Sequence, residues 1–284
     1  MIFLILAVIS SAAIALVLKF FRSQEGNRYG IIIGNYMTCI VISLIMIGDP
    51  RVIPAAAPST WICGIIGGLL FVAGLVFMQS SIKVNGATLT SAFGKLGVMV
   101  PLAMSLLVFG EKPAIVQVVG ILVALAALVV INLPSKDESN KAATYSFALL
   151  ILTFLGNGLA DSMAKVFEHI GSRSDDRIYI FFIFASACLI TAILAYVEYK
   201  KTSKKIIPKE LLAGIAVGIP NYYSSFFLLG SVERLPSFLV YPIFSTGTIL
   251  LVMVVSTLLF RERPSKTQYI GIAMILAALV LLNL

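Results

Sequence analysis

Long apolar stretches separated by short polar segments run along the whole chain. A bilayer core about 30 Å thick needs about 20 consecutive apolar residues in helical conformation. Ten stretches meet this requirement, and they predict an all-α integral membrane protein with ten transmembrane helices. The stretches cover residues 2–21, 29–47, 60–82, 86–109, 114–133, 145–168, 177–197, 209–231, 236–260 and 267–284.

The composition supports a membrane protein and argues against a soluble one. Of the 284 residues, 60% are hydrophobic and only 12% are charged, about half the charged fraction of soluble domains. The net charge of +8 comes from Lys and Arg that lie mostly between apolar runs, which excludes a nucleic-acid-binding domain. Cys39, Cys63 and Cys188 fall inside apolar runs and predict buried thiols, with no disulfide framework.

The basic residues between the apolar stretches are distributed unevenly between the two sides of the predicted membrane. Fourteen Lys and Arg fall on the side of the loop that follows the first stretch, and five fall on the other side. Basic residues concentrate in cytoplasmic loops. We therefore expect a plasma-membrane protein, most simply of a bacterial cytoplasmic membrane, with both termini outside and the 200–209 segment in the cytoplasm. The first stretch begins at residue 2 with no preceding basic residue, which predicts an uncleaved first helix.

The sequence repeats itself at an offset of 151 residues. Residues 111–133 and 262–284 are identical at twelve of 23 positions, and the matches include Glu111/Glu262, Gln117/Gln268 and Gly120/Gly271. Ser105/Ser256 extends the match weakly into the preceding stretch. Shared apolar composition does not produce matching Glu, Gln and Gly residues in register.

Each repeat unit contains five stretches, so two units in tandem must cross the membrane in opposite orientations. The predicted units are residues 1–133 and residues 145–284, joined by a cytoplasmic linker at residues 134–144. Inverted repeats are typical of secondary transporters, whose substrate site lies near the bilayer midplane.

The five-helix halves, each with a Glu-Lys/Arg-Pro turn and a Gln-x-x-Gly helix that ends in Asn-Leu, resemble EamA-type members of the drug/metabolite transporter superfamily. The resemblance covers essentially the whole chain. It implies a central cavity lined by the first four helices of each half and a peripheral fifth helix. It also implies transport of metabolites such as amino acids, sugars, nucleotide sugars or organic cations, by proton-coupled export or by exchange.

Lys95 is the first candidate substrate-binding residue. It lies nine or ten residues into the fourth stretch, at a depth of roughly 13–15 Å by helical rise, and a charge inside a span is costly. Related nucleotide-sugar and phosphate transporters place a substrate-facing lysine in a comparable glycine-containing helix. The alternative is a structural lysine that is paired with a carboxylate or with helix carbonyls.

Asp161 is the only carboxylate that the sequence places well inside a predicted span. Lys165 follows four residues later, in the order that favours an ion pair on one helix face. Asp161 is therefore either half of a local ion pair with Lys165 or a protonatable group that serves as the proton-coupling candidate.

Polar and aromatic residues within the stretches complete the predicted cavity lining, although transmembrane Asn and Ser residues equally join helices to one another. Pro220 is predicted to interrupt the eighth stretch just before Asn221, and Pro242 to interrupt the ninth. The further candidate substrate-binding residues are Asn35, Thr38, Gln79, Ser91, Asn157, Asn221, Tyr222, Tyr241 and Thr246.

These features predict a secondary transporter that moves a small polar or amphipathic metabolite by alternating access, and the family resemblance implies an exporter or exchanger. No motif of a hydrolase, a metalloenzyme, a P-loop or a dinucleotide site is present, so we expect no enzyme activity, metal or cofactor. The expected partners are the metabolite and membrane lipid, with no nucleic acid. The alternative from another class is a membrane-embedded sensor or assembly subunit that transports nothing.

Overall fold

The computed structural model describes residues 1–21, 26–27, 29–131, 146–259 and 265–284. These residues form α-helices and two short 3-10 helices, and among them there is no strand. The α-helices are α1 Ile2–Phe20, α2 Gly30–Ile47, α3 Pro58–Asn85, α4 Ala87–Leu96, α5 Met99–Leu107, α6 Ile115–Ile131, α7 Phe147–Ile170, α8 Asp176–Thr202, α9 Pro208–Val232, α10 Ser237–Leu259 and α11 Lys266–Leu282. The 3-10 helices are η1 Pro50–Ala55 and η2 Arg173–Asp175.

Eight helical segments in the described residues are long and apolar enough to cross a membrane. One of them, Leu89–Leu107, combines α4 and α5. Two shorter apolar helices occupy Ile115–Ile131 and Thr267–Leu282. The chain is therefore an all-helical, multi-pass membrane protein.

The chain folds into two compact units, and each unit draws on both halves of the sequence. Unit 1 comprises Met1–Val72 and Val166–Ser231, and unit 2 comprises Ala73–Lys165 and Val232–Leu284. The boundaries fall inside α3 and inside α7 rather than in a loop. Helices from the two sequence halves thus pack together within each unit.

Glycines bring the helices of unit 1 into close contact. A Cβ atom added to Gly34 in α2 would lie 3.1 Å from the Cα atom of Gly214 in α9, and 2.9 Å from the carbonyl oxygen of Leu211. In α3, a Cβ atom on Gly64 would lie 3.1 Å from the carbonyl oxygen of Tyr179 in α8. Small residues permit this backbone approach between membrane helices, so the GxxxG spacings of the sequence mark helix contacts.

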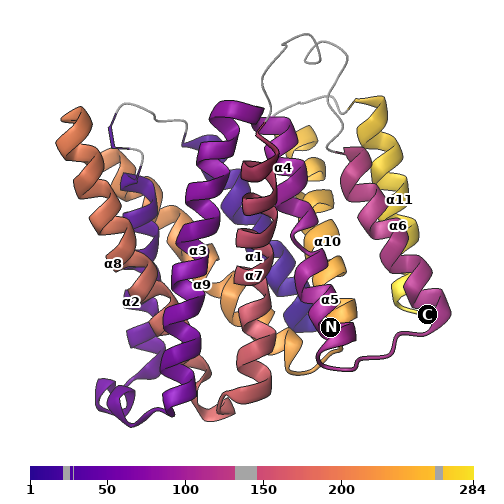
Figure 1. Cartoon of the computed structure of the whole chain (residues 1–284), viewed down its shortest axis with the longest axis horizontal. Coiled ribbons are helices and arrows are strands. Elements are labelled where there is room, and N and C mark those ends of the chain that lie inside the picture. Colours follow the sequence, from indigo (N-terminus) through magenta and orange to yellow (C-terminus); the bar gives the residue numbers. More distant parts are fainter. Residues whose placement is uncertain (22–25, 28, 132–145, 260–264) are drawn as a thin grey trace. The chain divides into compact units, whose positions relative to one another are not determined.

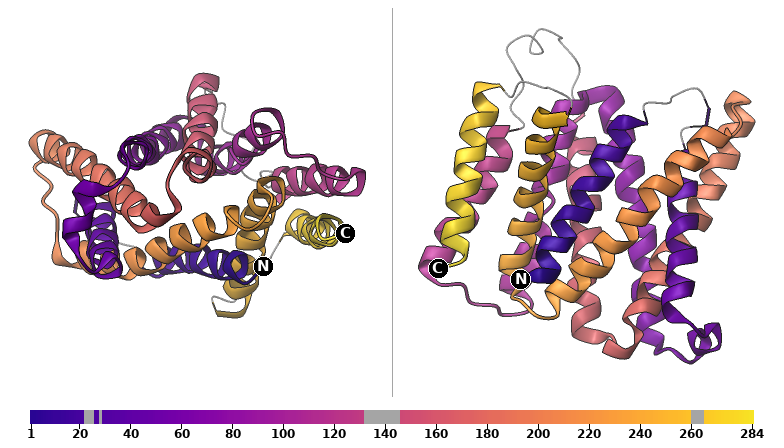
Figure 2. Two further views of the ribbon diagram at one scale, coloured as in Figure 1. Left: turned by 90° about the horizontal axis from the view of Figure 1, so that it is seen from below. Right: turned by 180° about the vertical axis from the view of Figure 1, so that it is seen from behind.

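The two helices that carry the sequence repeat, α6 and α11, run side by side in unit 2 (Figures 1 and 2). A Cβ atom on Gly120 in α6 would lie 3.1 Å from the backbone nitrogen of Leu282 in α11. Its repeat partner Gly271 packs in turn against Ile131 of α6. The matched glycines therefore form both sides of one helix–helix contact.

The repeated glutamines cap these same helices. The side-chain oxygen of Gln117 accepts a hydrogen bond of 3.0 Å from the backbone N–H of Ala114. Gln268 does the same for Ser265 at 2.8 Å, as part of a capping box in which the Ser265 hydroxyl accepts from the Gln268 N–H. Free N–H groups at a helix start need such acceptors, which explains why both repeats contain this glutamine.

The fourth predicted span is broken into α4 and α5 immediately after Lys95 (Figure 1). Pro101, in the first turn of α5, has no N–H to donate to the carbonyl four residues earlier, at Gly97, and its ring crowds that carbonyl. The chain makes tighter bonds instead, from Val98 N–H to the Lys95 carbonyl at 3.3 Å and from Val100 N–H to the Gly97 carbonyl at 2.9 Å. The break leaves Lys95 in the last turn of α4.

Pro220 and Pro242 do not end the helices in which they lie. Helix α9 continues through Pro220 and α10 continues through Pro242. The proline next to the division of a span is Pro101; at Gly97 the backbone is in the ordinary right-handed helical region, and a Cβ atom added there would lie 3.0 Å from the backbone nitrogen of Gly158 in α7. Gly86, between α3 and α4, has a φ of 80°, in the left-handed region.

Candidate substrate site

The predicted site residues divide between the two units. Unit 1 holds Asn35, Thr38, Asn221 and Tyr222. Unit 2 holds Gln79, Ser91, Lys95, Asn157, Asp161, Tyr241 and Thr246. Each group is described separately below.

Lys95 of α4 and Asp161 of α7 form the charged centre of the unit 2 group. The Lys95 residue is exposed and Asp161 is partly exposed, although both lie in apolar helices. Their charges interact across the space between them. No direct salt bridge joins them among the described contacts, so both charged groups remain available to a third partner.

Two neighbours fix the part of α7 on which Asp161 lies. The hydroxyl of Tyr241 in α10, which is 1% exposed, donates a hydrogen bond of 3.0 Å to the backbone carbonyl of Asp161. One turn earlier, Asn157 lies against glycines of two other helices. Cβ atoms added to Gly74 and Gly94 would lie 2.7 Å and 2.9 Å from its side-chain oxygen and nitrogen, respectively.

The remaining unit 2 candidates differ in whether their side-chain hydrogen-bonding atoms are already used within the protein. The side-chain oxygen of Gln79 is buried and has no hydrogen-bond partner. Ser91 lies one turn before Lys95 on the same face of α4. Thr246, by contrast, is fully buried, and its hydroxyl donates to the Pro242 carbonyl at 2.6 Å. Gln79 and Ser91 are therefore better placed than Thr246 to bind a polar group.

In unit 1, the predicted residues mainly join α2 to α9. The Asn221 amide donates a hydrogen bond of 3.0 Å to the side-chain oxygen of Asn35. Thr38 donates to the Gly34 carbonyl at 2.8 Å. Tyr222 is completely buried, and its hydroxyl has no hydrogen-bond partner. Asn35 and Asn221 thus connect helices, while Tyr222 keeps an unused polar atom.

The expected ion pair between Asp161 and Lys165 is not the one that the structure shows. The Lys165 ammonium instead lies 3.1 Å from a carboxylate oxygen of Glu111, in the segment between α5 and α6. It also lies over the ring of Phe109, 5.5 Å from the centroid. Because Lys165 is held by Glu111, Asp161 has Lys95 as its electrostatic partner.

Glu111 is a partly exposed junction between three elements of unit 2. The hydroxyl of Ser105 in α5 donates to its carboxylate, and the backbone N–H of Phe238 donates to the same oxygen at 3.1 Å. Phe238 is the second residue of α10. A carboxylate at the start of a helix satisfies free N–H groups and interacts favourably with the helix dipole. Glu111 therefore caps α10 from another part of the chain.

The surroundings of Glu111 favour its ionised form. Burial alone would raise its pKa, but hydrogen bonds from Ser105 and from the backbone of Ser237 and Phe238, together with Lys165, outweigh this effect. The pKa of Glu111 consequently lies below its ordinary value. At neutral pH, Glu111 is a stable counter-ion for Lys165.

A known protein family matches most of the chain. The sequence profile of the EamA-like transporter family matches residues 1–133 and 144–284. The chain belongs to the EamA-like transporter family. It is thus a multi-pass membrane transporter of the drug/metabolite transporter type.

Two further comparisons cover nearly the whole chain and name no substrate. An uncharacterized protein of Haemophilus influenzae is 24% identical over 284 residues, covering 97% of this chain and 95% of that protein. A solved crystal structure aligns with a TM-score of 0.71 at 16% identity, covering 99% of this chain and 94% of that chain. This likeness extends the shared fold to nearly the whole chain.

The Glu111 junction is the feature of this EamA-like chain that we did not expect from its sequence. Two signals were present: Glu111 matches Glu262, and Ser105 matches Ser256, at the repeat offset of 151. A repeated acid next to a repeated hydroxyl indicates a common structural task. Glu262 lies outside the described residues, so the junction is described for the first repeat.

Proposed function

We propose that this EamA-like protein is a secondary transporter with ten membrane-spanning helices. The eight long apolar segments and the two shorter apolar helices support this count. The shorter helix Ile115–Ile131 has 17 residues, which at 1.5 Å per residue gives about 25 Å, close to the minimum for a span. The two inverted repeats of residues 1–133 and 145–284, with a cytoplasmic linker at 134–144, complete the proposed topology.

The observation that carries the proposal is the arrangement of Lys95 and Asp161. Two opposite charges in apolar helices interact without a direct salt bridge among the described contacts, and neither residue falls in the buried class by surface area. A purely structural pair would gain most from direct contact with full mutual hydrogen bonding. A separated pair is better suited to a polar ligand that contacts both charges.

The proposed substrate is a small polar or amphipathic metabolite that binds near the break between α4 and α5. Lys95 contacts an anionic or electron-rich group of the substrate, and Ser91 and Asn157 contribute neutral hydrogen bonds. Broken helices near the bilayer midplane are a recurring way of building substrate sites in secondary transporters. Alternating access would then expose this site to one side of the membrane at a time.

Asp161 is the proposed proton-coupling residue. While Lys95 faces it, the carboxylate keeps its counter-charge. A substrate that attracts Lys95 would leave Asp161 without that charge in an apolar helix, which favours uptake of a proton. In this scheme, Lys95 and Asp161, both in unit 2, couple substrate binding to proton uptake.

The proposed location is a bacterial cytoplasmic membrane, with both termini outside and net transport outward or by exchange. The excess of fourteen basic residues over five supports this orientation. Occurrence of a full-length relative in the bacterium Haemophilus influenzae is consistent with the location.

Transport assays in proteoliposomes test the proposal directly. The purified protein is reconstituted and loaded with labelled representatives of amino acids, sugars, nucleotide sugars and organic cations, with and without a pH gradient. We expect saturable movement of at least one class that exceeds protein-free liposomes and is reduced in Lys95→Ala. Absence of transport for every class, with correctly folded protein, would favour the sensor or assembly-subunit alternative.

A further inference from the structure

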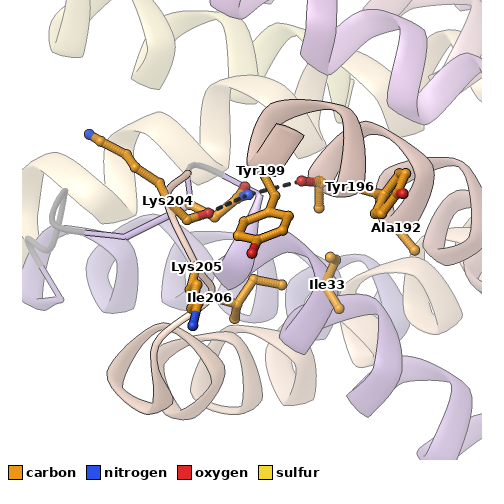
Figure 3. Close-up of a pocket in the computed structure, with 9 residues that line it drawn as sticks. Ile33, Ala192, Tyr196, Tyr199, Lys204, Lys205 and Ile206 are labelled. Atoms are coloured by element: carbon orange, nitrogen blue, oxygen red, sulfur yellow. Dashed lines mark hydrogen bonds between the residues drawn. The ribbon is translucent and has the colours of Figure 1, made fainter. Parts of the chain in front are cut away.

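A cavity of about 350 Å³ lies in unit 1, and none of the residues assigned above to substrate or proton lines it (Figure 3). It lies where the start of α2, the end of α8 and the segment that leads into α9 meet. The cavity is lined by Asn27, Ile33, Ala192, Ala195, Tyr196, Tyr199, Lys204, Lys205 and Ile206.

Asn27 holds the walls of this cavity together. Its side-chain amide donates to the Ala195 carbonyl at 3.0 Å and to the Lys204 carbonyl at 3.3 Å, while its backbone N–H donates to the Lys205 carbonyl at 3.1 Å. Its side-chain oxygen accepts from the Tyr29 N–H at 3.0 Å. Asn27 is 2% exposed, so the cavity is formed by a buried, fully engaged polar residue and not by a loose loop.

The cavity combines an apolar interior with a basic edge. Ile33, Ala192 and Ile206 supply aliphatic surface, and Figure 3 shows the ring of Tyr199 among them. The Lys204 and Lys205 side chains extend away from this ring, and both residues are exposed. Their long, flexible stems can direct an ammonium group toward an anion at the opening of the cavity.

The residues around the cavity are typical of the boundary between lipid tails and headgroups. Tyr196 and Tyr199 are 60% and 39% exposed, and tyrosines concentrate at membrane interfaces because the ring is apolar and the hydroxyl is polar. The Lys200 ammonium lies 5.5 Å from the centroid of the Tyr196 ring. Five lysines occur between residues 200 and 209, which favours anionic over neutral lipid headgroups.

We propose that this cavity binds one phospholipid with an anionic headgroup. The glycerol region and the upper part of an acyl chain occupy the space beside Ile33, Ala192 and Tyr199. The phosphate and the anionic headgroup interact with Lys204 and Lys205. The proposal goes beyond transport, since the lipid is retained as a bound component of the membrane protein and is not its cargo.

Charge alone does not account for these features. A basic loop that is needed only for orientation in the membrane requires neither an apolar cavity beside it nor a buried asparagine that fixes its backbone. A soluble anion would not use the aliphatic and aromatic walls. A phospholipid is the ligand class that matches the apolar walls and the basic edge together.

Native mass spectrometry of the full chain in detergent tests the proposal. The probes are phosphatidylglycerol and phosphatidylcholine with identical chains, added at increasing concentration. We expect one phosphatidylglycerol to bind with a preference over phosphatidylcholine of about tenfold or more, since each lysine near an anionic headgroup contributes about 1 kcal/mol. Equal binding of the two lipids, or binding of neither, would overturn the proposal.

Matched variants separate the cavity from the basic segment as a whole. Lys204→Gln/Lys205→Gln is expected to abolish the preference for phosphatidylglycerol. Lys201→Gln/Lys209→Gln removes the same charge from exposed lysines that do not line the cavity, and it should keep most of the preference. Equal loss in both double variants would show a general charge effect and contradict a defined site.

Filling the cavity tests its apolar part. Ala192→Trp should prevent binding of both lipids, whereas Ile193→Trp, at an exposed neighbour that does not line the cavity, should leave binding unchanged. Ala192→Leu is the alternative if the Ala192→Trp variant does not fold. Normal binding in a folded Ala192 variant, or full competition by chain-free glycerol phosphate, would overturn the assignment to a phospholipid.

Discussion

The Lys165 ammonium lies 3.1 Å from the Glu111 carboxylate, although Asp161 is only one helical turn away on α7. Two carboxylates of unit 2, Glu111 and Asp161, therefore have different basic partners. Glu111 and Lys165 connect the segment after α5 to α7, and Glu111 also caps α10. Asp161 is left facing Lys95, in a pair without direct contact. We propose that the two carboxylates differ in role, with Glu111 structural and Asp161 directed toward a ligand.

Loss of the Glu111 carboxylate should destabilise the protein strongly. In Glu111→Gln, Lys165 keeps its charge but loses its counter-ion, and the side chains of Glu111 and Lys165 are only 15% and 11% exposed. Removing one partner of a buried pair costs about 3–5 kcal/mol. We expect a clear decrease in melting temperature, measured by thermal unfolding in detergent.

A matched control is available in the same unit. Glu233 and Arg234 also form a 3.1 Å salt bridge, but the Arg234 side chain is 55% exposed. Glu233→Gln should therefore cost less than about 1 kcal/mol. Similar decreases in melting temperature for the two variants would show that Glu111 has no special structural role.

The same junction predicts a pH dependence of stability. The pKa of Glu111 is lower in the folded protein than its ordinary value of 4.5. Its stabilising contribution is therefore complete above that ordinary value and is lost as the pH falls through the lower, folded value. Melting temperatures of the native protein and of Glu111→Gln should converge at acidic pH. A difference that stays constant over the whole acidic range in which both proteins remain folded would contradict this assignment.

The described residues show how far the sequence determines this structure. Apolar runs located the helices, because length and hydropathy alone decide whether a segment can cross a bilayer. Glycine residues permit close contacts between helices, as at Gly34 and Gly214. These features depend on residues that are near one another in the chain, or on composition, and both are visible without a fold.

Features that depend on distant partners could not be predicted in this way. The partner of Lys165 lies in the segment between α5 and α6, and a helical-spacing rule considers only neighbours on α7. Likewise, α9 and α10 continue through Pro220 and Pro242, whereas Pro101 lies next to the division between α4 and α5. Whether a proline ends a helix depends on the backbone freedom and the packing around it.

The orientation of the chain can be tested by cysteine labelling. In a variant that lacks Cys39, Cys63 and Cys188, a single cysteine at position 203 should be protected from membrane-impermeant maleimide in intact cells. A single cysteine at position 173 should react, because the positive-inside distribution places this loop outside. Disrupted cells should label at both positions, which controls for local accessibility. The reverse pattern in intact cells would invert the proposed topology.

Lys95 should be essential for transport but not for folding. Lys95→Ala removes a charge that has no direct salt bridge among the described contacts, so we expect a normal melting temperature. Transport should fall by about tenfold or more, the value of a charged contact with substrate. Lys95→Arg should retain part of the activity, since it keeps the charge but changes its shape.

Lys83→Ala is the control for Lys95, because it removes an exposed lysine near the end of α3, outside the proposed site. It should transport at the native rate. Native transport by a folded Lys95→Met variant would refute a substrate-binding role. Loss of folding in both Lys95→Ala and Lys95→Met would instead assign Lys95 to the structural alternative.

Asp161→Asn separates proton coupling from substrate binding. The amide keeps the size and hydrogen-bonding capacity of the carboxylate but cannot take up a proton. We expect the variant to lose accumulation driven by a pH gradient while it retains exchange of labelled for unlabelled substrate in proteoliposomes. Asp49→Asn, at an exposed position outside the helices, should preserve both activities. Exchange persists in this scheme because a transporter that carries substrate in both directions needs no net uptake or release of a proton.

Unchanged gradient-driven accumulation in Asp161→Asn would show that Asp161 is only a counter-charge for Lys95. Loss of exchange as well would place Asp161 in direct contact with the substrate.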